Sequence, residues 1–408
     1  MLVHWIWLAA RPGLNDREKV AVLEYFSDPE AAFYAPAEAF GKVEGLSSRA
    51  VAALADKNLS GAEEILQQCS EKQIHICTYR DGAYPAKLKN IPDPPVVLYY
   101  KGVLPDLDGH PVIGVVGTRE CSGYGISTAQ RLGYQIAACG AVVVSGAAKG
   151  IDTAAMTGAM TAGGKVVGVL GSGVDVVYPA SARQLYRDTE QAGCLVSEFP
   201  PGTAPLKWNF PKRNRIISGL SCGILVVEAP EESGALITAR QAAEQGRDVF
   251  VVPGNIDMPS FTGSNALLRE GAIMAGSGWD VVGEYQTQYP DKVHKNIELP
   301  ENVEHSMPKV AQKPASPAEK KTFDRRKEKI TVDKKASCAY SDVDSYRPAS
   351  PDEAVLLEKL GKDTWQIDEL IAGAGLPTGK ILSLLTLLEI KGVVERLQGQ
   401  QVRRKNKP

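Results

Sequence analysis

Three basic side chains and an asparagine stand side by side near the middle of the chain, within the stretch FPKRNRIISGL at residues 210–220. Lys212, Arg213 and Arg215 are cationic, Asn214 can donate hydrogen bonds, and an apolar run that predicts a buried segment follows them directly. Such a cluster is either a solvated helix edge or a clamp for phosphate groups. The loops elsewhere in the chain decide between these two interpretations.

Five glycine-rich stretches each follow a short run of β-branched residues. A glycine turn that leads into a helix exposes backbone N–H groups and the positive end of the helix dipole, which suits an anion. One such turn would carry little weight, because loops between strands and helices need glycine for geometry alone. Five at one edge of a sheet favour an anion-binding rim. They lie at residues 115–125, 145–152, 171–175, 228–239 and 252–265.

Basic residues fall in the same loops as the glycines. Arg119 lies in the first stretch, Lys149 in the second, and Lys207 shortly before the basic cluster. A mononucleotide needs one phosphate site, whereas an extended row of cations fits a polymer backbone, and a single strand adds base stacking on nearby rings. The candidate phosphate-binding residues are Gly117, Arg119, Ser122, Gly125, Ser145, Gly146, Lys149, Gly150, Lys207, Lys212, Arg213, Asn214, Arg215, Ser233 and Gly234.

Polar and aromatic residues of this rim each have two interpretations. Ser122, Ser145 and Ser233 either donate their hydroxyl hydrogens to phosphate or cap helices. Asp152 opens the helix after SGAAKG, where an N-cap role is favoured over a role as a ligand. The rings that could stack on bases, with packing in the core as the equal alternative, are Tyr124, Trp208 and Phe210.

The sequence offers little for catalysis. No G-x-x-x-x-G-K-[ST] motif is present, which disfavours a P-loop, and GSGVDVV lacks the third glycine of a dinucleotide-binding turn. All five histidines lie outside residues 111–293, so this region has no imidazole as a general base or metal ligand. Glu228 remains a candidate catalyst, but a single carboxylate is a weak signal. We therefore expect a protein that is not an enzyme and binds no cofactor or metal.

The composition is that of a globular protein and restricts how it could bind nucleic acid. The 408 residues suffice for two or three domains, and the net charge of −2 means that affinity for nucleic acid must come from local clustering. Seven scattered cysteines without a C-x-x-C pair suit a reducing compartment. The apolar opening MLVHWIWLAARPGL lacks a basic leader and is too short to span a bilayer. We expect a buried first helix and a cytoplasmic protein with no membrane partner.

The glycine-rich loops are expected to lie at one edge of the sheet of an α/β fold. Apolar strands alternate with helix-length segments, which indicates an extended Rossmann-like parallel sheet with helices on both faces. Ligands of such sheets bind at the carboxyl ends of the strands, near the topological switch point. The predicted strands lie at residues 112–116, 141–145, 165–170, 194–198, 223–228 and 248–253.

Two further domains are expected to flank this sheet. Residues 1–75 predict a helical domain, in which VEGLSSRAVAAL resembles either a helix-hairpin-helix or a SAM-like packing module. The α/β domain spans 76–288, and residues 289–350, which are rich in proline and lysine, predict a flexible linker. Residues 351–408 predict three helices and a β-hairpin, the layout of a winged helix.

Taken in order, the motifs resemble those of the bacterial DNA-processing protein A family, also called DprA or Smf. The matching stretches include GTRECSGYG, SGAAKGID, SEFPPG and FPKRNRIISGLS, and continue through VVEAPEESGALITARQAAEQGRDVFVVPG and SNALLREGA. The match runs from Tyr79 to Asp280, about half the chain, and its joint specificity is high. The two flanking domains also resemble accessory domains of this family.

The resemblance implies a single-stranded DNA-binding homodimer without enzymatic activity. Members of the family hand DNA to the RecA recombinase and displace single-strand-binding protein, chiefly during natural transformation. By motif position, the DNA-contacting pocket includes Arg119, the SGAAKG turn and the basic cluster at 212–215. On this basis the cluster is a phosphate clamp and not a solvated edge.

Two positions depart from the family pattern. The family usually has a histidine where this chain has Met156, which weakens the transfer of the second loop's role. The family's arginine in SGxARG is replaced by Lys149, which keeps the charge but loses the planar, bidentate guanidinium. We expect less exact phosphate geometry at Lys149 without loss of binding.

Two other functions compete with this interpretation. Rossmann-like folds include nucleoside-monophosphate phosphoribohydrolases, but those carry PGGxGTxxE where this chain reads EAPEESGALITA. The winged helix could instead bind duplex DNA. However, its expected recognition helix PTGKILSLLTLLEIKG carries Lys380 and Lys391 as its only cations and is rich in leucine, which favours protein contact or core packing.

Overall fold

A computed structural model describes residues 1–295 and, with gaps, residues 351–404. These residues belong to two separate compact units, which we describe individually. The predicted linker at 289–350 falls largely outside the described residues. None of the described helices combines the length and apolar character needed to cross a lipid bilayer.

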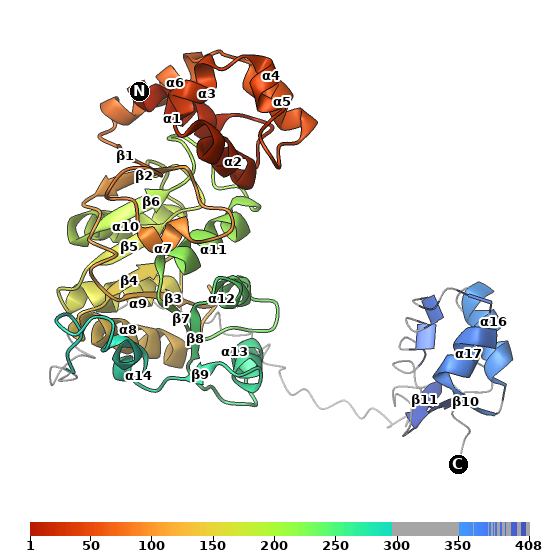
Figure 1. The fold of residues 1–408 in the computed structure, drawn as a ribbon. Coiled ribbons are helices and arrows are strands. Elements are labelled where there is room, and N and C mark those ends of the chain that lie inside the picture. The colour runs from red at the N-terminus through yellow and green to blue at the C-terminus, as the bar shows by residue number, and fades with distance from the viewer. Residues whose placement is uncertain are drawn as a thin grey trace, which may run out of the picture. The chain divides into compact units, whose positions relative to one another are not determined.

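The first unit begins with six helices, which gather beyond the β1 end of a large sheet (Figure 1). The predicted buried first helix is confirmed, because Trp5 and Trp7 are enclosed in the core. Asn15 and Glu18 form a reciprocal capping box that starts the second helix. The helices are α1 (Leu2–Ala10), α2 (Asp16–Phe26), α3 (Pro29–Tyr34), α4 (Ala37–Phe40), α5 (Ser48–Ala55) and α6 (Ser60–Glu71).

A nine-stranded sheet follows in the order β1-β2-β6-β5-β4-β3-β7-β8-β9. The six predicted strands are present and parallel, which confirms the Rossmann-like fold. At one end β1 and β2 are antiparallel, so the sheet is mixed there. The strands are β1 (His75–Thr78), β2 (Val97–Gly102), β3 (Val112–Val116), β4 (Val142–Ser145), β5 (Val166–Val169), β6 (Cys194–Ser197), β7 (Gly223–Val226), β8 (Asp248–Val251) and β9 (Ile273–Met274).

Helices cover both faces of the sheet because the strand residues alternate between two apolar cores. In β3, Ile113 and Val115 pack in the core beneath α8 and α9, whereas Val112 and Val116 pack in the core beneath α11 and α12. The helices of this part are α7 (Ala86–Lys89), α8 (Gly123–Ala138), α9 (Ile151–Thr161), α10 (Arg183–Ala192), α11 (Asn209–Leu220), α12 (Gly234–Glu244), α13 (Thr262–Arg269) and α14 (Gly278–Val282), with short 3-10 turns at Ala180–Ala182, Pro259–Phe261 and Gly283–Tyr285.

The second unit confirms the predicted winged helix. Its described elements are α16 (Pro351–Leu360), β10 (Thr364–Gln366), α17 (Ile367–Gly373), β11 (Val394–Leu397) and β12 (Gln401–Arg404). The last two strands form the predicted hairpin, and β10 adds a third strand on the other side of β12. Leucines of both described helices lie in its core. The third predicted helix lies partly outside the described residues.

Candidate nucleic-acid interface

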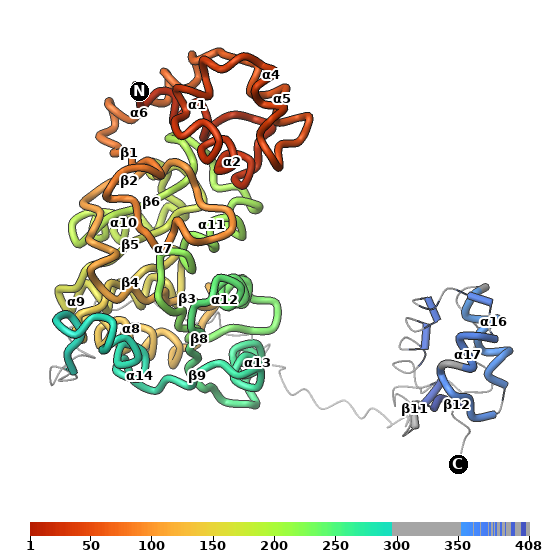
Figure 2. The backbone as a smooth tube through the Cα atoms, viewed as in Figure 1, coloured from red at the N-terminus to blue at the C-terminus, as the bar shows by residue number. Residues whose placement is uncertain are grey.

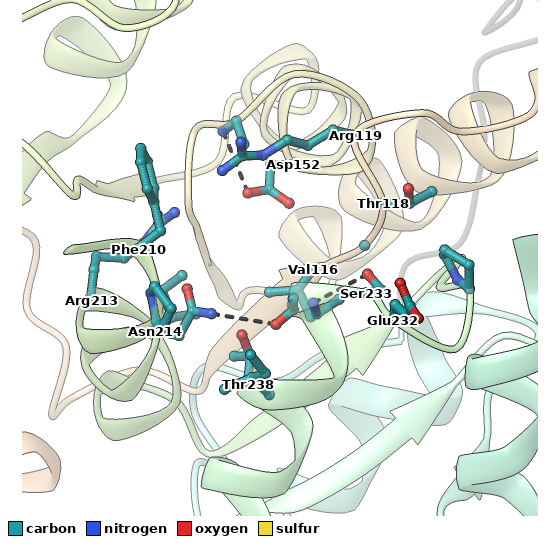
Figure 3. A pocket seen from close by; sticks show the side chains of 18 of the residues that line it. Val116, Thr118, Arg119, Asp152, Phe210, Arg213, Asn214, Glu232, Ser233 and Thr238 are labelled. Atoms are coloured by element: carbon teal, nitrogen blue, oxygen red, sulfur yellow. Dashed lines mark hydrogen bonds between the residues drawn. The ribbon is translucent and has the colours of Figure 1, made fainter. Parts of the chain in front are cut away.

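A cavity of about 380 Å³, the first cavity, opens where the strand order reverses. Strand β3 has β4 on one side and β7 on the other, so the loops that leave β3 and β7 diverge to opposite faces of the sheet. The wall opposite these loops comes from α11. Figure 3 shows this cavity, which is lined by residues 116–120, Ala148, Asp152, Phe210, Pro211, Arg213, Asn214, Ile217, Pro230, residues 232–235, Ile237 and Thr238.

A second cavity of about 270 Å³ adjoins the first. Both cavities share Arg119, Glu120, Ala148 and Phe210, so they form one continuous feature, which we call the groove. The other lining residues of the second cavity are Gly146, Lys149, Leu170, Gly171, Ser172, Tyr178, Pro179 and Tyr186.

A stacked pair separates the two halves of the groove. The guanidinium carbon of Arg119 lies 5.0 Å from the centroid of the Phe210 ring, and Figure 3 shows both side chains above the first cavity. The ring of Tyr178, 43% exposed, lies 5.9 Å from that of Phe210 on the side of the second cavity. A cation and two rings therefore follow one another along the groove, which suits stacking of bases beside phosphates.

Arg213 is at the inner wall of the first cavity and is only 4% exposed. Its guanidinium donates to the carbonyl oxygen of Val169 at the end of β5. Burial lowers the pKa of Arg213 to about 10, opposed by the nearby carboxylate of Asp152. Arg213 is thus largely committed to the protein interior, with one edge facing the cavity.

Asp152 holds the second glycine-rich loop in place. The predicted N-cap role is wrong, because Gly150 precedes the first residue of α9 and Asp152 lies within its first turn. The Asp152 carboxylate accepts from the N–H groups of Gly146 (3.1 Å) and Ala148 (3.4 Å). Burial raises the pKa of Asp152, and the charge of Arg213 is the largest opposing effect. These two loop amides are therefore satisfied internally, so anion binding at this loop depends on exposed Lys149.

The start of α12 forms the other wall of the first cavity. Ser233 caps the helix by accepting from the N–H of Ala235 (3.3 Å), and the Asn214 side chain donates to the carbonyl of Gly234 (3.4 Å), as drawn in Figure 3. The positive end of the α12 dipole therefore faces the cavity. Asn214 links α11 to this helix end.

The basic cluster divides between two faces of α11. Residues three apart on a helix share a face, which places Lys212 with Arg215 and away from Arg213. The Lys212 ammonium lies 2.8 Å from Asp16 of α2 and 3.3 Å from Glu198, which follows β6. Arg215 lies 2.9 Å from Asp16 and 2.5 Å from Glu198. Of the four clustered residues, Arg213 and Asn214 line the groove and Lys212 and Arg215 do not.

Several other predicted site residues have structural partners instead of lining the groove. Ser122 caps α8 and donates its hydroxyl hydrogen to Glu228 (2.8 Å), and fully buried Ser145 donates to the carbonyl of Val115 (2.6 Å). Gly125 packs against the Glu228 carboxylate, where a Cβ atom would lie 1.8 Å from it. Gly150 (φ +94°) lies against the Thr118 carbonyl. Exposed Lys207 lines neither cavity.

Glu228 has a structural role in this arrangement. Its fully buried carboxylate accepts from both the backbone N–H and the hydroxyl of Ser122, which fixes the first loop at the start of α8. It does not line either cavity. The geometry therefore gives the candidate catalyst a partner within the fold and no access to the groove.

Three aromatic predictions have different outcomes. Phe210 lines both cavities, whereas Trp208 and Tyr124 are 71% and 53% exposed and line neither. Tyr178 was missed, although it follows the glycine-rich stretch at residues 171–175, which was the available signal. Met156, which departs from the family pattern, is fully buried.

The formal charges of the groove lining balance. Arg119, Lys149 and Arg213 are its cations, and Glu120, Asp152 and Glu232 are its carboxylates. Asp152 and Arg213 are buried together, so Arg119 and Lys149 are the exposed cations of the lining. Glu120, Glu232 and Thr238 were missed, because acidic and neutral residues in these loops carried no signal for a phosphate site.

Comparison with known proteins identifies close similarity over most of the chain. Residues 75–286 match the family described as DNA recombination-mediator protein A, and residues 342–400 match the DprA winged helix domain. DNA processing protein DprA of Streptococcus pneumoniae is 45% identical over 206 residues, which cover 50% of this chain and 72% of that protein. Protein Smf of Escherichia coli K12 is 32% identical over 339 residues, covering 81% and 77%.

The fold comparison agrees with the sequence comparison. The X-ray structure of DNA processing protein A from Streptococcus pneumoniae is 36% identical and has a TM-score of 0.62. It covers 70% of this chain and 98% of the other. A solved structure therefore shares the fold of most of this chain.

Proposed function

The chain belongs to the DNA recombination-mediator protein A family, and from this premise we propose that its groove binds single-stranded DNA. Arg119 and Lys149 would contact consecutive phosphates, while Phe210 and Tyr178 would stack against bases. One observation carries the proposal: the Arg119 guanidinium lies on the Phe210 ring between two adjoining cavities. A phosphate contact and a stacking surface are thus available side by side, as single strands require.

We propose a role in handing the strand to a recombinase without catalysis. The candidate catalyst Glu228 accepts hydrogen bonds from the backbone N–H and the hydroxyl of Ser122 and lines neither cavity. In line with the family, we propose that the protein acts as a homodimer, loads RecA and displaces single-strand-binding protein in recombination and natural transformation. Light scattering of the purified protein tests the dimer, and the rate of RecA filament assembly on strands coated with single-strand-binding protein tests the loading.

A salt titration with single-stranded and duplex oligonucleotides of equal length tests the groove. Two exposed cations predict a log–log slope of about −1.4 for one groove, at about −0.7 per phosphate. Arg119→Ala should flatten the slope by about 0.7 and weaken binding to all sequences equally. Lys165→Ala, on the opposite end of the β5 strand, is the control and should change nothing.

The outcomes of this titration separate the candidate functions. A preference for the single strand that is lost in Arg119→Ala supports the proposal. If the duplex binds as tightly as the single strand and Arg119→Ala does not weaken either, the winged helix and not the groove would be the DNA-binding site. Release of free base from nucleoside monophosphates would instead support a nucleotide-processing enzyme.

A further inference from the structure

Six charged side chains join the N-terminal helices to the start of α11. Asp16 of α2 contacts Lys19 (3.1 Å), Lys212 (2.8 Å) and Arg215 (2.9 Å). Figure 2 shows α2 descending towards this part of the sheet domain. Three carboxylates thus meet three cations; the other two carboxylates are Glu198, which contacts Lys212 and Arg215, and Asp93, 3.4 Å from Arg215.

The members of this network differ in their access to solvent. The side chains of Asp16, Glu198 and Arg215 are 9%, 5% and 5% exposed, whereas that of Lys212 is 42% exposed. Burial opposes the charge of Asp16, but the charges of Lys19, Lys212 and Arg215 outweigh it and hold the pKa of Asp16 well below its ordinary value. Lys212 is therefore a surface cation bound to an ionised carboxylate.

Lys212 also lies next to the groove without lining it. Phe210 and Pro211, the two residues before it, line the first cavity. A lysine side chain has several rotatable bonds, so an unbound Lys212 could reach a phosphate that leaves the cavity. Its ion pairs with Asp16 (2.8 Å) and Glu198 (3.3 Å) hold it on the other face of α11.

We infer that Asp16 withholds Lys212 from the DNA strand, so that the N-terminal helices set how many phosphates the sheet domain contacts. This inference rests on the proposed binding of single-stranded DNA. Asp16 acts through Lys212 and is a positioning residue that does not touch the strand. Asp16 therefore lowers the affinity for DNA, because the wild-type groove uses the two exposed cations Arg119 and Lys149 and does not use Lys212.

Asp16→Asn tests the inference by removing the shorter of the two carboxylate contacts of Lys212 with little change in shape. The remaining carboxylate, Glu198, is already paired with Arg215 at 2.5 Å. The log–log slope of the single-strand salt titration should steepen by about 0.7. Over the tenfold fall in salt from 1 M to 0.1 M, this steeper slope corresponds to about fivefold higher affinity at 0.1 M salt. Adding Lys212→Ala should abolish both gains. Asp56→Asn is the matched control, because Asp56 is also an ion-paired carboxylate of the N-terminal helices, 2.7 Å from Arg11. It adds the same net charge and should leave the slope unchanged.

The single variant Lys212→Ala gives an independent readout that does not require Asp16→Asn to fold. Its slope should equal that of the wild type, whereas Arg119→Ala flattens the slope. A slope flattened by about 0.7 in Lys212→Ala, or an Asp16→Asn protein that folds and binds no more tightly, would overturn the inference and leave the proposed function intact. Absence of single-strand binding by the wild type would overturn both.

Discussion

Replacing Arg213 by alanine should destabilise the fold more than it weakens a phosphate contact. Its side chain is 4% exposed and donates to the Val169 carbonyl, and its charge offsets that of Asp152, which is 7% exposed. Removing one partner of a buried ion pair costs about 3–5 kcal/mol, and losing the nearby charge that offsets Asp152 leaves this buried carboxylate uncompensated in the same way. We expect Arg213→Ala to lower the free energy of unfolding by an amount in this range, which includes the cost of leaving the Val169 carbonyl without its donor.

Urea unfolding of the full chain, followed by circular dichroism, measures this loss. The double variant Arg213→Met/Asp152→Asn removes both charges and keeps similar volumes, so it should recover at least half of the stability lost by Arg213→Ala. The slope of the transition with urea should remain constant, since the surface exposed on unfolding is the same. If the unfolding free energy of Arg213→Ala lies within about 1 kcal/mol of the wild-type value while DNA binding is weaker, Arg213 is a phosphate ligand and not a structural residue.

Two further changes test the packing of the same unit. Gly133→Ala would place a Cβ atom 2.1 Å from the Ala155 carbonyl, so α8 and α9 must separate at a cost of about 3 kcal/mol, whereas Gly123→Ala in the same α8 meets no atom within 4 Å and should be nearly neutral in thermal unfolding. Glu18→Gln should cost about 1–3 kcal/mol at pH 7, because the Glu18 carboxylate accepts from Ser47 Oγ (2.6 Å) and two backbone N–H groups. Burial opposes the charge of Glu18, but these hydrogen bonds outweigh burial and lower the pKa of Glu18. The stability that the ionised Glu18 contributes is therefore complete above about pH 5 and is lost as the pH falls. The urea midpoints of Glu18→Gln and the wild type should accordingly converge towards about pH 3. A stable Gly133→Ala protein, or a gap for Glu18→Gln that widens in acid, would contradict these predictions.

The sequence predicted the central strands and missed those at the edges. The six parallel strands are continuous apolar runs because both of their faces are buried, and their predicted ends lie within about two residues of the observed ones. Strand β9 is only two residues long, and β2 follows a proline-rich segment whose composition indicated an irregular path. The two residues of β9 are too few to show a period, whereas β2 has six residues and was obscured by the prolines before it.

The site was predicted in part for a similar reason. Glycine turns and cations in successive loops placed Arg119, Lys149 and Phe210 correctly at one sheet edge, because parallel strands bring their carboxyl ends together. The ion pairs of Lys212 and Arg215 could not be predicted, because their partner Asp16 lies 199 positions before Arg215 in the chain. Local sequence gives the charge of a side chain, and only the tertiary fold decides which carboxylate reaches it.

Photo-crosslinking would identify the residues that a bound single strand touches. A single-stranded oligonucleotide that carries 5-iodouracil at one position would be irradiated with the wild-type protein, and the crosslinked peptide would be identified by mass spectrometry. If the groove binds the strand, crosslinks should form at Phe210 or Tyr178 and should be lost in the double variant Phe210→Ala/Tyr178→Ala. Crosslinks confined to residues 351–404, or to the exposed ring of Trp208 outside the groove, would contradict it.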